Sequence, residues 1–319
     1  MKFFRYFIIL GLIIAGVAIM QFKKWVVASG PLSDSVVVDI NRGVSSQRVA
    51  DILYNSGVIR HPLLFRVLMK YQKAEEKIKA GEYLFEAEIS MQNVLNKLLQ
   101  GDVLYHKITV PEGYTVAQIA EVLKADDNLS GEVSFVLPEG SFLPETYTFP
   151  KGESRDNILK KAGSAMQKKL ENIWEGREAD LPYKNMQELL IMASIIEKET
   201  GIDSERAQVA SVFVNRLRKG MLLQTDPTVI YALTKGQQDL GRLLTRKDLT
   251  IDDPYNTYKF AGLPPTPICN PGEASLYAAA HPAATDYLYF VASGNGGHNF
   301  AKTLSEHNRN VAHWKQITQ

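Results

Sequence analysis

The 319-residue chain contains a single cysteine, Cys269, and has no marked excess of charge of either sign. One thiol excludes an internal disulfide and a zinc site built from several cysteines. Cysteine poverty is compatible with a reducing cytosol and with an exported bacterial protein that folds without disulfides. Lys and Arg number 36 and Asp and Glu number 35, and no basic stripe is present. We therefore expect no nucleic-acid partner.

The chain also lacks the short motifs of common cofactor-dependent and nucleophile-dependent enzymes. It has no H-E-x-x-H zinc motif and no G-x-S-x-G nucleophile elbow. The glycines of residues 294–297 do not match the dinucleotide-binding pattern. His298, His307 and His313 suggest a metal site, but no cysteine or zinc motif accompanies them. We expect neither a metal nor an organic cofactor.

Long apolar runs are almost missing, and the exception is residues 6–22, which are broken only by Gln21. Basic residues flank this run on both sides, and as a helix it would reach about 25 Å, near the lower limit for crossing a bilayer. A cleaved signal peptide is the alternative, with residues 26–28 as the cleavage site. We favour a retained, single-pass anchor in the cytoplasmic (inner) membrane. A basic segment followed by an apolar run is an export signal, so the rest of the chain would lie on the periplasmic, extracytoplasmic side.

A strand–glycine–helix pattern occurs twice, at residues 36–57 and 107–124. Ser45 and Thr115 occupy the helix N-cap position of the two copies, and residues 29–35 before the first copy are turn-rich and predict a linker. Segments between the copies predict a strand at 80–85 and a helix at 91–99, which suggests one compact α+β module. The repeat resembles LysM, a small carbohydrate-binding fold of cell-wall proteins. A simple packing repeat is the alternative.

The most informative segment is the predicted helix at residues 186–200. Residues 189–196 are uninterruptedly apolar or small, so we expect the helix to be buried on all sides. Glu197 follows, with apolar residues one, two and three turns behind it. Desolvation and a position near the helix C-terminus would both raise its pKa, which suits a general acid. The alternative is a surface glutamate at a fraying end, paired with Lys198 or Arg206.

A second carboxylate for a glycosidase pair would have to come from elsewhere in the chain. Glu199 cannot supply it, because residues two apart on a helix point about 200° away from each other. Asp226 is a candidate, although capping a helix that begins at Pro227 would explain Asp226 equally well.

Two polar segments follow. Residues 254–267 are too rich in proline for a helix or central strand and predict a stiff loop that carries Tyr255, Asn256 and Tyr258. Aromatic rings and amides on such a loop suit sugar recognition, and a structural wrap over the core is the alternative. Residues 287–292 predict a buried strand that runs into a glycine-rich turn ending at His298.

Five spaced segments together resemble the MltG (YceG-like) family of endolytic murein transglycosylases. In chain order they are residues 193–200 (ASIIEKET), 223–231 (LQTDPTVIY), 255–258 (YNTY), 262–265 (GLPP) and 296–298 (GGH). The resemblance covers nearly the whole chain and implies that Glu197 is the catalytic glutamate. It also implies substrate-binding positions in the glycan cleft at Gln224, Asp226, Tyr255, Asn256, Tyr258 and His298.

The mechanism that this resemblance implies is lytic transglycosylation of peptidoglycan strands. Glu197 would protonate the oxygen that leaves N-acetylmuramic acid and then accept the proton of that sugar's 6-hydroxyl, which produces a 1,6-anhydro end. Peptidoglycan synthases are candidate partners. Two alternatives stay open: a muramidase that uses Glu197, Asp226 and water, and a non-catalytic scaffold that binds the wall.

The expected fold class is α+β throughout. We expect a single N-terminal transmembrane helix with the start of a linker at residues 1–28 and a LysM-like α+β module at 29–130. A mixed α+β catalytic domain would follow at 131–319.

Overall fold

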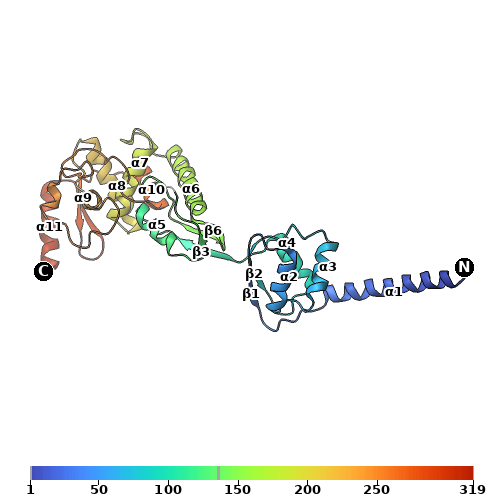
Figure 1. Ribbon diagram of the computed structural model, residues 1–319. Helices are drawn as coiled ribbons and strands as arrows, with labels where there is room; N and C mark the ends of the chain where they lie inside the picture. Colours follow the sequence, from blue (N-terminus) through green and yellow to red (C-terminus); the bar gives the residue numbers. More distant parts are fainter. Residues whose placement is uncertain (1, 135–136, 319) are drawn as a thin grey trace. The chain divides into compact units, whose positions relative to one another are not determined.

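The computed structural model describes residues 2–134 and 137–318. It forms a mixed α and β fold of two compact units (Figure 1). Unit 1 comprises Met1–His106 with Thr148–Gly152, and unit 2 comprises Lys107–Tyr147 with Glu153–Gln319. This division falls at His106, whereas the expected domain boundary was at residue 130. The second copy of the repeat therefore lies in unit 2, apart from the first.

Unit 1 is built from a two-stranded antiparallel sheet and short helices. Its elements are α1 (Lys2–Val27), β1 (Val36–Ile40), α2 (Ser46–Asn55), α3 (Pro62–Tyr71), β2 (Gly81–Phe85) and α4 (Met91–Gln100). The strands β1 and β2 pair antiparallel. Local chemistry explains several boundaries, because Ser45 caps α2 and Ser90 caps α4, while Gly101 ends α4 at a φ of +72°. These caps confirm the predicted helix starts at Ser45 and Ser90. Helix α3 was not predicted from the sequence.

Helix α1 contains the expected apolar run. Within the part of the chain that the structure describes, it is the helix long and apolar enough to cross a membrane, over Ile8–Val27. Its last turns belong to unit 1, because Val26 is only 5% exposed in the core of that unit and Phe22 packs against the same core. The apolar stretch that is free to cross a bilayer therefore ends near Phe22.

The segment expected to be a linker is attached to unit 1. The Gly30 N–H donates to the Glu88 carbonyl over 3.0 Å, and the Glu88 N–H donates to the Leu32 carbonyl over 2.9 Å. Leu32 also packs against the core of the unit. Residues 29–35 are turn-rich, as predicted, but these backbone bonds hold them against the loop before α4.

Unit 2 is mainly helical, and its strands form two-stranded sheets. Its elements, with the strands β3 and β5 through which the division from unit 1 runs, are β3 (Tyr105–Thr109), α5 (Val116–Lys124), β4 (Leu129–Ser130), β5 (Thr146–Pro150), β6 (Glu153–Ser154), α6 (Arg155–Glu175), α7 (Met186–Glu199), α8 (Asp203–Arg218), α9 (Asp226–Thr234), the 3-10 helix η1 (Asp248–Thr250), α10 (Glu273–Ala280), β7 (Tyr289–Ala292), β8 (His298–Ala301) and α11 (Leu304–Thr318). The sheets pair β3 with β5, β4 with β6 in parallel, and β7 with β8 antiparallel.

Helix α7 is the central element of unit 2. All residues from Leu189 to Ile196 are buried, as predicted, and α7 packs against α6, α8, α9 and α10. Asn185 caps its N-terminus through a bond from the Glu188 N–H. The predicted strand at 287–292 appears as β7, but its residues are half-buried or exposed instead of buried. Helix α11 packs against the β7–β8 hairpin. The side chains of β7 are nevertheless only partly covered.

Candidate functional site

The two glutamates at the end of α7 face different surroundings, as their spacing on the helix predicts. The half-buried Glu197 accepts a hydrogen bond at Oε2 from the Gly272 N–H over 3.0 Å. A Cβ at Gly113 would lie 3.6 Å from the Cγ of Glu197. Burial, together with the negative charge of Glu197, raises the pKa of Glu112. Glu197 thus lies against two loops of unit 2, next to another carboxyl group.

Glu199 lies in a cleft of about 460 Å³, a size typical of ligand pockets. The lining residues are Glu199, Phe213, Arg216, Leu223, Gln224, Asp226, Tyr258, Phe290, Val291 and His307. Three of the predicted substrate-binding residues, Gln224, Asp226 and Tyr258, are therefore brought together. Glu197 is not among the described residues that line this cleft.

The environment of Glu199 favours its protonated form. Burial raises the pKa of Glu199 to about 7, and the negative charge of Asp226 acts in the same direction. The Thr225 hydroxyl donates to Oε1 of Glu199, which opposes the rise. Thr225 is buried, and the Thr257 hydroxyl accepts a hydrogen bond from its N–H over 3.1 Å. This carboxyl group has the acid character that the helix pattern had assigned to Glu197.

Asp226 is held by a tyrosine and does not cap a helix. It is the first residue of α9, whose N-cap residue is Thr225. The Tyr258 hydroxyl donates to Oδ1 of Asp226 over 2.6 Å. The capping alternative for Asp226 is therefore wrong, because the chain enters α9 one residue earlier than expected. Gln224, two residues before Asp226, has a φ of +50°, which an L-residue seldom adopts, so this turn is a strained approach to the cleft.

Tyr255 and Asn256 lie inside the loop that carries Tyr258. The side-chain amide of Asn256 is fully buried and donates to two backbone carbonyls, while its Oδ1 accepts from the Tyr258 N–H over 3.0 Å. The Tyr255 hydroxyl bonds that of Thr266 at 2.6 Å. Neither residue is among the described residues that line the cleft, and these contacts shape the loop and aim Tyr258.

His298 lies beside the cleft. The ring Nδ1 of His298 is 2.8 Å from Oε2 of Glu205, and the backbone N–H of His298 donates to Oε1 of the same carboxylate over 3.0 Å. The ring of Phe290, which lines the cleft, meets the His298 ring edge-on at 5.3 Å. A protonated His298 is close enough to lower the pKa of Glu199. The Glu205 carboxylate therefore orients an imidazole near Glu199.

Sequence reasoning did not assign Glu199, Thr225, Arg216 or His307 to this site. It considered Glu199 only as a partner for Glu197, and His307 only as a metal ligand. Arg216 is buried, and its Nε and Nη1 each donate over 2.7 Å, to the carbonyls of Leu288 and Leu223. Thr225 lies within one recognised motif, so its hydroxyl was an available signal. Arg216 and His307 are on helices without a distinctive pattern. Among the described residues, no group of three or more His, Cys, Asp or Glu side chains could hold a metal ion.

Comparisons with known proteins agree on one family. The profile of the YceG-like family matches residues 38–313. An endolytic murein transglycosylase of Bacillus subtilis (strain 168) is 37% identical over 309 residues, which cover 86% of this chain and 83% of that protein. Another, from Streptococcus pneumoniae serotype 2 (strain D39 / NCTC 7466), is 29% identical and covers 87% of this chain but 58% of its own length. A crystal structure of a yceG-like protein from Listeria monocytogenes has a TM-score of 0.53 and 34% identity, covering 86% of this chain and 99% of its own.

Proposed function

The chain belongs to the YceG-like family, and we propose on this basis that it is an endolytic murein transglycosylase. It cleaves the bond between N-acetylmuramic acid and N-acetylglucosamine inside peptidoglycan strands and leaves 1,6-anhydro ends. Relatives with this name cover most of the chain, and the scaffold and muramidase alternatives are not favoured. The observation that carries the chemistry is the cleft in which Glu199 lies with Asp226 and Tyr258.

We propose Glu199, in place of Glu197, as the acid and base of the reaction. Glu199 lines the cleft, and its pKa of about 7 keeps a substantial protonated fraction at neutral pH. Glu197 is engaged by the Gly272 N–H, and we assign it to holding the loop at that residue. Glu197 and Glu199 are separated by one residue and lie in the same motif, so the family resemblance is compatible with either of them as the acid.

The reaction needs one carboxyl group in two roles. Protonated Glu199 donates to the glycosidic oxygen, and the bond from that oxygen to the anomeric carbon of muramic acid breaks. The 6-hydroxyl of the same sugar forms the new bond to the anomeric carbon and gives its proton to the Glu199 carboxylate. The proton count balances, and no water is consumed. Asp226, held by Tyr258, is proposed to stabilise the positive charge that develops at the anomeric carbon.

The remaining substrate contacts follow from the same cleft. Gln224 and Tyr258 line it directly and are proposed to bind sugar hydroxyl groups. His298, oriented by Glu205, is proposed to donate to the substrate beside Glu199. Tyr255 and Asn256 act through the loop that positions Tyr258.

Unit 1 and α1 are proposed to hold the enzyme at its substrate. We propose that α1 is a retained anchor in the cytoplasmic membrane, because its last turns are built into the core of unit 1. The rest of unit 1 and the whole of unit 2 are proposed to lie outside the cytoplasm. The strand–helix–helix–strand order of β1, α2, α3 and β2 supports a LysM-like, glycan-binding module. Peptidoglycan synthases, which make the strands that the enzyme would cut, are the proposed protein partners.

Product chemistry tests the proposal. The purified full chain is incubated with uncrosslinked peptidoglycan strands, and the new ends are identified by mass spectrometry. The expected products carry 1,6-anhydro-muramic acid, which is lighter than the hydrolysis product by one water. Free reducing ends would show a muramidase, and unchanged strand length would show a scaffold.

A further inference from the structure

Helix α3 exposes an apolar stripe that the described residues of unit 1 leave largely uncovered. Leu63, Val67 and Tyr71 are 70%, 53% and 77% exposed. They are spaced by four residues and therefore form one line along the helix. The opposite side of α3 is buried in the core of the unit. An exposed apolar line of this length on a small unit marks an interaction surface.

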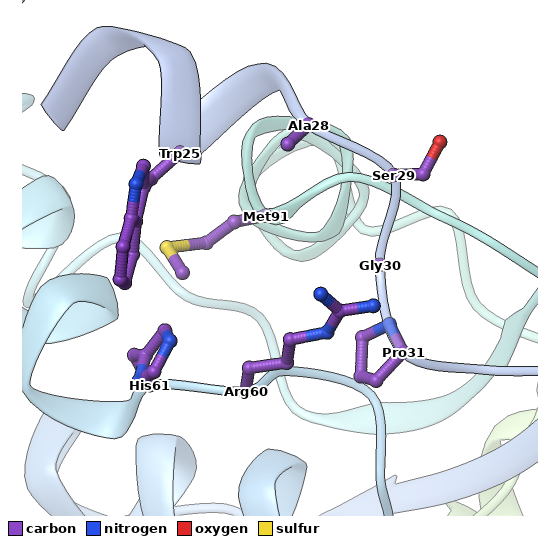
Figure 2. Close-up of a pocket in the computed structure, with 8 residues that line it drawn as sticks. All are labelled: Trp25, Ala28, Ser29, Gly30, Pro31, Arg60, His61 and Met91. Atoms are coloured by element: carbon purple, nitrogen blue, oxygen red, sulfur yellow. The ribbon is translucent and has the colours of Figure 1, made fainter. Parts of the chain in front are cut away.

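Both ends of α3 lie against the end of α1. At the N-terminal end, the ring of His61 lies 4.7 Å from that of Trp25, and both residues line a small cavity (Figure 2). At the other end, Leu68 and Tyr71 line a second cavity together with Phe22 and other residues of the last turns of α1.

These contacts set the direction of α3. The ten residues of α3 extend about 15 Å, whereas the α1 residues that line these two cavities, Phe22 to Val27, extend only about 9 Å along the axis of α1. Helix α3 therefore runs across the axis of α1. It lies at the end of unit 1 from which α1 departs (Figure 1). An α1 that crosses a bilayer would therefore place α3 near the bilayer surface and roughly parallel to it.

The charged residues on α3 and on the last turns of α1 are all basic. Arg66 and Lys70 are on α3, which has no acidic residue, and Arg60 precedes it. Lys23 and Lys24 are at the same level on α1. None of these five basic side chains has an ion-pair partner in the described parts of the chain. Unpaired basic residues beside an apolar stripe match the surface of an anionic membrane.

We propose that the α3 face, defined as Leu63, Val67 and Tyr71 with Arg66 and Lys70, lies on the membrane surface and binds anionic lipid headgroups. Trp25 marks the same level on α1, where tryptophan favours the membrane–water interface. The inference rests on the proposed anchor and is independent of the catalytic residues. Unit 1 is then held flat on the bilayer by two elements, α1 through it and α3 along it.

Spin labels on single introduced cysteines test this contact in the full chain. The native Cys269 is fully buried, so a thiol label reports the introduced site. Val67→Cys probes the α3 face, and Val37→Cys on β1, 48% exposed, is the matched control. The chain is placed in lipid nanodiscs of phosphatidylcholine alone or with phosphatidylglycerol. Collision of each label with oxygen and with a water-soluble nickel chelate is then measured.

The expected result is that the Val67 label is shielded from nickel and open to oxygen in anionic nanodiscs. The shielding should fall several-fold in phosphatidylcholine, while the Val37 label stays open to nickel in both. Equal nickel access at the two sites would overturn the proposal, and equal shielding in both lipids would overturn the assignment to anionic headgroups. Dipolar broadening between Val67 labels would instead indicate a second copy on this face. A label at Ile13→Cys distinguishes failure of the anchor, since it must report a hydrocarbon environment for α1 to cross the bilayer.

Discussion

Replacing Glu199 with glutamine removes the proposed acid while keeping its size. Glutamine retains an oxygen that can accept from the Thr225 hydroxyl, but it cannot donate and then recover the proton of the reaction. General acid–base catalysis typically contributes about 100-fold to 10,000-fold in rate. We expect Glu199→Gln to lower kcat by this factor with folding and glycan binding retained.

The raised pKa gives this prediction a second, quantitative form. A carboxyl group with a pKa of about 7 is half protonated at pH 7, whereas one at the usual 4.5 would be about 0.3% protonated. The cleft therefore supplies roughly 160-fold more of the acid form at neutral pH. Because the protonated group is required, kcat/KM should fall about tenfold per pH unit above pH 7.

The matched control is Glu197→Gln, on the same helix. Its side-chain oxygen can still accept from the Gly272 N–H, so the activity should stay within a few-fold of the wild type. The assay is the initial rate of 1,6-anhydro end formation from uncrosslinked strands between pH 5 and 9, with circular dichroism as a check on folding. The reasoning is refuted if Glu197→Gln is the inactive variant and Glu199→Gln is active.

Three further predictions concern other residues of unit 2. Thr225→Val removes the hydroxyl that holds the pKa of Glu199 down, so the alkaline limb of the pH–rate profile should move to higher pH; an unmoved limb would contradict this hydrogen bond. Burial raises the pKa of Glu139 to about 7, so its contribution to stability is complete below pH 4.5 and is lost as the pH rises through 7. In thermal unfolding, Glu139→Gln should have the same free energy of unfolding as the wild type at pH 4 and a higher one, by about 1–2 kcal/mol, at pH 8. Gly140→Ala should cost more than about 2 kcal/mol, because φ is +82° and the new Cβ would lie 2.7 Å from a packed proline. Gly152→Ala, with a φ of +78° and open space, is its control and should melt at a clearly higher temperature.

Local rules account for most of the elements. Ser45, Ser90 and Thr115 cap their helices as predicted, because an N-cap depends only on its own side chain and the next three residues. The burial of α7 also follows from composition, since a helix that is apolar on every side is stable only inside a core. The helix α3 has a proline at its first position and apolar residues at helical spacing, so its signal was present and went unused.

Family, reaction class and the segment that carries the proposed acid could therefore be predicted from the amino-acid sequence. The choice between Glu197 and Glu199 could not, because an all-apolar helix contains no information about which of its sides will meet the cleft. That choice depends on Thr225, which reaches Glu199 from 26 positions along the chain, and on the left-handed turn at Gln224 that precedes it. The burial that raises the pKa of Glu199 comes from side chains on several elements of unit 2, and only the tertiary structure brings them together.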